Sequence, residues 1–86
     1  MSNINLVDIS RLDFNLAITF LAIWQEGSVS KAANRLSLSQ SAVSAALARL
    51  RLAANDELFI RTRTGMQPTP RAAAMEPRFS LCTVMG

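Results

Sequence analysis

The side chains best suited to chemistry in this 86-residue chain are an amide and several hydroxyls near its middle. Gln40 lies between Ser39 and Ser41, and Ser44 follows one helical turn later. A Gln amide can form two hydrogen bonds with adenine, and Ser hydroxyls can contact bases or phosphates. The alternative is an ordinary solvated helix surface, which is usually rich in Lys and Glu. Neither occurs in residues 39–48, so the pattern favours recognition of a base edge.

Basic side chains gather in the same part of the chain. Residues 31–71 carry seven Lys or Arg and two carboxylates, a net charge of +5, whereas residues 1–30 sum to −2 and residues 72–86 to zero. A basic segment favours binding of a polyanion through its phosphates, and a plain solvated surface is the alternative. The cations expected to contact DNA are Lys31, Arg35, Arg51, Arg61 and Arg63. Arg63 is a candidate for a minor-groove or phosphate contact, and Arg61 for a phosphate or a structural role.

Other classes of site find no support in the sequence. No His is present, and Cys82, the one Cys, excludes an internal disulfide and a cysteine-based zinc site. No paired carboxylates, glycine-rich phosphate loop or nucleophile motif stands out. No apolar run approaches the roughly 18 residues of a membrane span, and residues 1–10 lack the pattern of a signal peptide. We therefore expect no enzymatic activity, no metal, no cofactor, no membrane association and a cytoplasmic location.

The first helix is expected to begin at Phe14, with Asp13 as its N-cap and residues 1–12 as a loose lead-in. Its apolar residues recur at helical spacing, which predicts that one face is buried. Gly27 is expected to end this helix. The face so predicted contains Leu16, Phe20 and Ile23.

Two more helices follow in quick succession. Ser28 is the predicted N-cap of a short helix over residues 29–36, and Ser39 the N-cap of a third helix over residues 40–53. The turn between them contains one apolar residue, Leu38, which we expect to plug the core. Helical spacing predicts inner faces that consist of Ala32, Ala33, Leu36, Val43, Leu47 and Leu50.

A hairpin and a fourth helix complete the pattern. Residues 58–61 and 66–67 read as two short strands around a turn at residues 62–65. Thr69, followed by a proline, is a helix start signal. The fourth helix should reach at least Glu76, and Pro77 is expected to end or kink it.

The element order predicts a mainly α fold, a winged helix-turn-helix with three helices and a two-stranded wing, followed by the start of a linker helix. A third helix that enters a major groove about 12 Å wide needs a slim outer face. The small residues expected there are Ser41, Ser44, Ala45 and Ala48. We assign residues 1–68 to the winged helix-turn-helix domain, 69–78 to the start of a linker or dimerisation helix, and 79–86 to an atypical apolar tail.

Several motifs occur in order between about residues 12 and 75. They are LDFNL at 12–16, EGS at 26–28, KAANRL at 31–36, LSQSAVS at 38–44, LFIR at 58–61 and GMQPTPRA at 65–72. Together they resemble the N-terminal DNA-binding domain of LysR-type transcriptional regulators. Each motif alone is weak evidence, but their combination and spacing are specific.

The resemblance implies a transcription factor that binds double-stranded DNA as a homodimer paired through its linker helix. It also implies a larger C-terminal domain that binds a small inducer and is absent from this sequence. Three positions depart from the family pattern. Ser41 stands where many members have Pro, and Ala45 where many have Arg. In the wing, Thr64 replaces a common Arg, with Arg63 one position earlier.

Two other interpretations remain open, because the resemblance ends after Arg78. The chain could be a headless regulator that forms mixed dimers with a full-length relative and inactivates it. It could also be a truncated fragment without function. Formation of mixed dimers would distinguish the first interpretation, and poor folding would favour the second.

Overall fold

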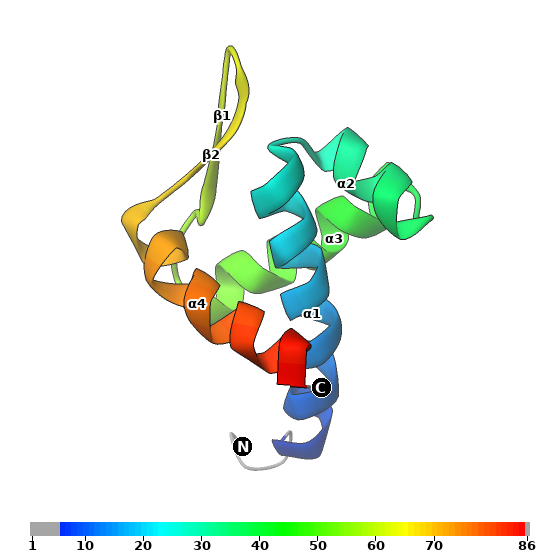
Figure 1. The fold of residues 1–86 in the computed structure, drawn as a ribbon, viewed down its shortest axis with the longest axis vertical. Helices are drawn as coiled ribbons and strands as arrows, with labels where there is room; N and C mark the ends of the chain where they lie inside the picture. Colours follow the sequence, from blue (N-terminus) through cyan, green and yellow to red (C-terminus); the bar gives the residue numbers. More distant parts are fainter. Residues whose placement is uncertain (1–5, 86) are drawn as a thin grey trace.

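Helix α1 is the element around which the others are arranged (Figure 1). The computed structural model describes the backbone of residues 6–85, with side chains over 15–77, 79 and 80. Helices α2, α3 and α4 all pack against α1, and the hairpin projects from the body of the molecule (Figure 1). The elements, in chain order, are α1 (Leu6–Glu26), α2 (Val29–Leu36), α3 (Gln40–Ala54), β1 (Phe59–Thr62), β2 (Gly65–Pro68) and α4 (Pro70–Met85).

Hydroxyl caps begin three of the helices, as the sequence predicted for α2 and α3. The hydroxyl of Ser28 accepts a hydrogen bond from Lys31 N at 3.2 Å, and that of Ser39 from Ala42 N at 3.1 Å. Thr69 does the same for α4. Each cap satisfies a backbone N–H that has no partner within its helix. The predicted bounds of α2 are confirmed, and α3 ends one residue later than predicted.

The core lies where α1, α2 and α3 meet the base of the hairpin. Phe20 is fully buried, and its ring lies 5.1 Å from that of Phe59 and 4.9 Å from that of Phe79, between centroids. The predicted buried face of α1 is confirmed, as is most of the predicted inner surface of α2 and α3. The side chains that confirm it are Leu16, Phe20, Ile23, Ala32, Ala33, Val43, Leu47 and Leu50.

Two expectations for the helical part are wrong. Helix α1 begins at Leu6, so residues 6–12 are not a loose lead-in and Asp13 does not cap the helix. Apolar residues continue at three-residue intervals upstream of Asp13, and this pattern outweighs one local capping signal. Leu38 does not plug the core, because 48% of its surface is exposed. Leu38 instead lines an open hollow between α1 and α3.

The hairpin and α4 also differ from expectation. The two strands pair antiparallel from Phe59 opposite Pro68 to Thr62 opposite Gly65, so the predicted four-residue turn is a two-residue turn. Helix α4 does not end at Pro77 but continues to Met85. An interior proline costs about 3 kcal/mol, and aromatic packing by Phe79, two residues further on, offsets part of that cost.

The predicted fold class is confirmed. Three helices and a two-stranded antiparallel sheet precede a fourth helix, and the hairpin Phe59–Pro68 occupies the position of a wing. We call this hairpin the wing below. Within residues 6–85, no helix is long and apolar enough to cross a membrane.

Candidate nucleic-acid interface

Four of the residues proposed from the sequence line a single hollow between α3 and the wing. Gln40 and Ser44 come from α3, and Arg61 and Arg63 from the wing. The hollow has a volume of about 290 Å³, and its other lining residues are Ser28, Val29, Ser30, Thr62, Gly65 and Met66. No carboxylate is among these lining residues. The surface therefore offers amide, hydroxyl and guanidinium donors, which suit acceptor atoms of bases and phosphates.

Between Gln40 and Arg49 the outer surface of α3 is slim, because the large apolar residues of this stretch point inward. Val43, Leu47 and Leu50 are buried. On the other side, the exposed residues between Gln40 and Arg49 are mostly small, namely Ser41, Ala42, Ser44, Ala45 and Ala48. A helix of this width can approach the floor of a groove closely. Ser39 is exposed as well, although its hydroxyl already serves as the N-cap.

The second strand of the wing is fixed to the corner between α1 and α2. Met66 N donates a hydrogen bond to the carbonyl oxygen of Gly27 at 2.9 Å. Gly65 makes this close approach possible, because a Cβ atom at that position would lie 2.5 Å from the same oxygen. Its φ of +127° is also a conformation that other residues rarely adopt. The wing thus has a defined position relative to the first turn of α2.

Arg51 does not line the hollow but lies at the base of the wing. Its Nε donates to the carbonyl oxygen of Glu57 and its Nη2 to that of Phe59, both at 2.8 Å. The Glu57 carboxylate lies 3.7 Å from Arg51 Nε. Residue types do not indicate this contact, since backbone acceptors leave no pattern in the sequence.

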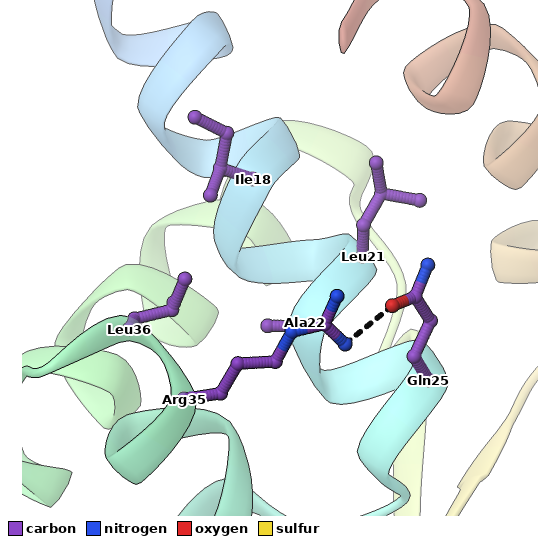
Figure 2. Close-up of a pocket in the computed structure, with 6 residues that line it drawn as sticks. All are labelled: Ile18, Leu21, Ala22, Gln25, Arg35 and Leu36. Atoms are coloured by element: carbon purple, nitrogen blue, oxygen red, sulfur yellow. Dashed lines mark hydrogen bonds between the residues drawn. The ribbon is translucent and has the colours of Figure 1, made fainter. Parts of the chain in front are cut away.

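Arg35 and Lys31 also lie outside the hollow, although both are exposed on α2. Arg35 turns toward α1, where its Nη1 donates to the side chain of Gln25 and lies 3.2 Å from the Glu26 carboxylate. Figure 2 shows its guanidinium beside Ala22, next to a second hollow of about 200 Å³ between α1 and α2. Arg35 therefore connects α2 to α1, with half of its side chain exposed.

One carboxylate connects the loop after α3 to the start of α4. Asp56 Oδ2 accepts hydrogen bonds from the Thr69 hydroxyl at 2.7 Å and from Leu58 N at 2.9 Å. These two bonds, with a smaller contribution from the charge of Arg71, lower the pKa of the Asp56 carboxyl below its ordinary value. In the part of the chain whose side chains are described, no cluster of His, Cys, Asp and Glu could hold a metal ion.

The sequence matches the profile of bacterial regulatory helix-turn-helix proteins of the lysR family over residues 14–73. The chain belongs to the LysR family. The match includes every residue that lines the hollow, from Ser28 to Met66. The family resemblance drawn from the motifs is thus confirmed.

Individual LysR-family comparisons agree with this assignment. The chain is 51% identical over 61 residues to the HTH-type transcriptional regulator LeuO of Escherichia coli K12. The aligned segment covers 71% of this chain and 19% of LeuO. A probable transcriptional regulator of Pseudomonas aeruginosa, PA0477, superposes with a TM-score of 0.80 at 41% identity, over 87% of this chain and 25% of PA0477. The chain therefore spans about a fifth to a quarter of the length of these two proteins.

A third LysR-family comparison concerns the fold alone. The DNA-binding domain of CbnR, solved in a complex with DNA, superposes with a TM-score of 0.78 at 22% identity. The superposition covers 84% of this chain and 83% of that domain. The two domains therefore share most of their fold.

Proposed function

We propose that this chain is a sequence-specific domain of a transcriptional regulator that binds double-stranded DNA. Helix α3 enters the major groove, and the wing contacts the phosphate backbone or the minor groove. The observation that carries the proposal is the hollow in which Gln40 and Ser44 meet Arg61 and Arg63 without a carboxylate. The fold shared with a domain solved on DNA supports it.

Within this proposal four exposed residues of α3 have a role in reading the DNA. Gln40 pairs with an adenine edge, Ser41 and Ser44 contact bases or phosphates, and Ala45 packs against a thymine methyl group. Ser39 adds a phosphate contact to its capping role. No cation replaces the missing Arg at position 45, so this part of the interface reads bases without a formal charge.

The phosphate contacts come from the flanks. Arg61 and Arg63 approach the backbone or a narrow minor groove from the wing, and Lys31 approaches from α2. We give Arg35 no direct contact, because its guanidinium already bonds to Gln25 and Glu26.

The proposed partner besides DNA is a second copy of the chain. Helix α4 is 16 residues long, and pairing through it would produce the two-fold symmetry that symmetric operators require. A cytoplasmic location, where bacterial DNA lies, follows from the same proposal. Mixed dimers with a full-length relative would use the same helix.

The decisive experiment selects bound duplexes from a random pool and then measures affinity for the selected site across a salt series. Arg61→Ala should reduce the slope of log affinity against log salt by about 0.9, the value for one phosphate contact. Arg35→Ala is the matched control and should leave the slope unchanged. If no duplex is retained at low salt, or if affinity does not depend on salt, the proposed function is wrong.

A further inference from the structure

The Arg51 guanidinium joins the last turns of α3 to the first strand of the wing. Its two hydrogen bonds go to the carbonyl oxygens of Glu57 and Phe59, the residues on either side of Leu58. We propose that Arg51 is a positioning residue, which sets the place of the wing relative to α3 and acts on DNA only through Arg61 and Arg63. This inference rests on the proposed function of the wing.

The segment that Arg51 holds has an unusual backbone. Asn55 and Leu58 both adopt positive φ values, 53° and 65°, and Leu58 is fully buried. A left-handed Leu persists only where its surroundings fix it. The carbonyl oxygens on both sides of Leu58 accept from Arg51, and its own carbonyl oxygen accepts from Thr69 N at 2.8 Å. Three successive carbonyls therefore hold the turn, and Arg51 supplies the donors for two of them.

The position of the wing tip depends on this turn. Arg61 and Arg63 lie two and four residues after Phe59, and a strand advances about 3.3 Å per residue. A two-stranded hairpin is not stable by itself, so its direction is determined where it is anchored. Strand β2 is anchored on Gly27 by Met66 N, and β1 by the buried ring of Phe59 and by the hydrogen bonds of Arg51. Loss of Arg51 should release the carbonyls around Leu58, so that the wing pivots about Phe59 and its tip is displaced.

The surroundings of Arg51 do not suit a phosphate. It lines a shallow hollow with Leu52, Asn55, Asp56 and Glu57, separate from the hollow that contains Gln40. Two carboxylates belong to that lining, and the nearer lies 3.7 Å from Arg51 Nε. Because a second anion would meet these carboxylates, Arg51 is better suited to the wing than to the DNA backbone.

The first test measures the wing without DNA. Spin labels are placed at Thr64→Cys in the wing turn and Asn34→Cys on α2, in a Cys82→Ser chain. The distance distribution between the labels should be narrow in this background and broad with Arg51→Lys, which keeps the charge but loses the two-pronged donor geometry. Arg49→Lys is the matched control on the same helix and should leave it narrow. A narrow distribution with both Arg51→Lys and Arg51→Ala, each confirmed as folded by circular dichroism, would overturn the proposal.

The second test is a double-mutant cycle on the selected DNA site. Arg51→Lys should weaken binding about 3- to 30-fold in the normal chain, and less than about twofold when Arg61→Ala and Arg63→Ala are already present. Equal weakening in both backgrounds would show a direct DNA contact and overturn the proposal. If the chain does not bind DNA at all, the proposed function fails, while the spin-label distances still decide whether Arg51 positions the wing.

Discussion

The carboxylate of Asp56 lies 2.7 Å from the hydroxyl of Thr69 and accepts its hydrogen bond, while the same hydroxyl caps α4 by accepting from Ala72 N. The loop that follows α3 and the first turn of α4 therefore share one hydroxyl. A charge on Asp56 strengthens this arrangement, because a carboxylate accepts hydrogen bonds better than a carboxylic acid does.

Asp56→Asn should therefore destabilise the domain at neutral pH and have little effect in acid. Since the pKa of Asp56 is lower in the folded chain than in the unfolded chain, its stabilisation is complete above about pH 4. The stabilisation is lost as the pH falls through the lower, folded-state pKa. Urea unfolding at pH 7 and pH 3 measures this effect, with Glu57→Gln as the control. A difference between the original chain and Asp56→Asn that stays constant across this range would contradict the prediction.

Gly65→Ala should lower the free energy of unfolding by more than Gly27→Ala does. Both glycines have positive φ, but a Cβ at Gly65 would meet the Gly27 carbonyl oxygen at 2.5 Å, whereas a Cβ at Gly27 has no atom within 4 Å. We expect about 1 kcal/mol for Gly27→Ala from conformation alone, and about 2–4 kcal/mol for Gly65→Ala. Thermal unfolding of the two variants provides the comparison, and equal losses would mean that the wing can move away from Gly27 at no cost.

Gln40→Ala should change specificity more than it changes overall affinity. The Gln40 side chain is exposed and lines the hollow, so its loss should remove about 1–3 kcal/mol of discrimination at one base pair. Asn34→Ala, which removes an exposed amide from α2 outside the hollow, is the matched control. Selection of sites by each variant tests the assignment. An unchanged profile with Gln40→Ala would place the base-reading surface elsewhere on the domain.

Phe79→Ala should destabilise the domain although Phe79 follows the proline in α4. Its ring packs edge to face on Phe20, and its side chain is partly buried against the core. We expect a loss of about 1–3 kcal/mol, below the 3–5 kcal/mol typical of a fully buried Phe. Leu52→Ala removes an apolar side chain that is 84% exposed and should cost less than about 0.5 kcal/mol. Equal urea midpoints for the two variants would show that α4 beyond Pro77 adds nothing to stability.

Sequence reasoning succeeded where one local signal determines the structure. The hydroxyls of Ser28 and Ser39 identified the starts of α2 and α3 because an N-cap needs only a side chain and the next helical turn. The helical spacing of Val43, Leu47 and Leu50 identified the buried face of α3, and hence its outer face, because this spacing is also a local property. The sequence therefore predicted the bounds and the buried face of α3 closely.

Sequence reasoning failed where the structure depends on contacts between residues that are not neighbours in the chain. Nothing in the residue types shows that Leu58 adopts a left-handed conformation, or that Arg51 bonds to carbonyls several residues away. The bonds of Arg35 to Gln25 and Glu26 leave no signal either, because these partners lie on another helix. Leu38 was assigned to the core because it is apolar, whereas it is half-exposed and lines an open hollow between α1 and α3. These are properties of the assembled fold.

The hydrogen bond from Met66 N to Gly27 also has a consequence for the order of folding. Helix pairs α1–α2 and α2–α3 join neighbouring parts of the chain, and such local contacts form early. The wing can dock only after the corner at Gly27 has formed. The contact between Gly27 and Met66 closes a long loop, which costs more conformational entropy than the contacts between neighbouring helices do. We therefore expect amide protons of the wing to exchange with solvent through openings that leave the helices intact. The arginines of the wing would then be the last part of the domain to reach their final positions, and the first to leave them.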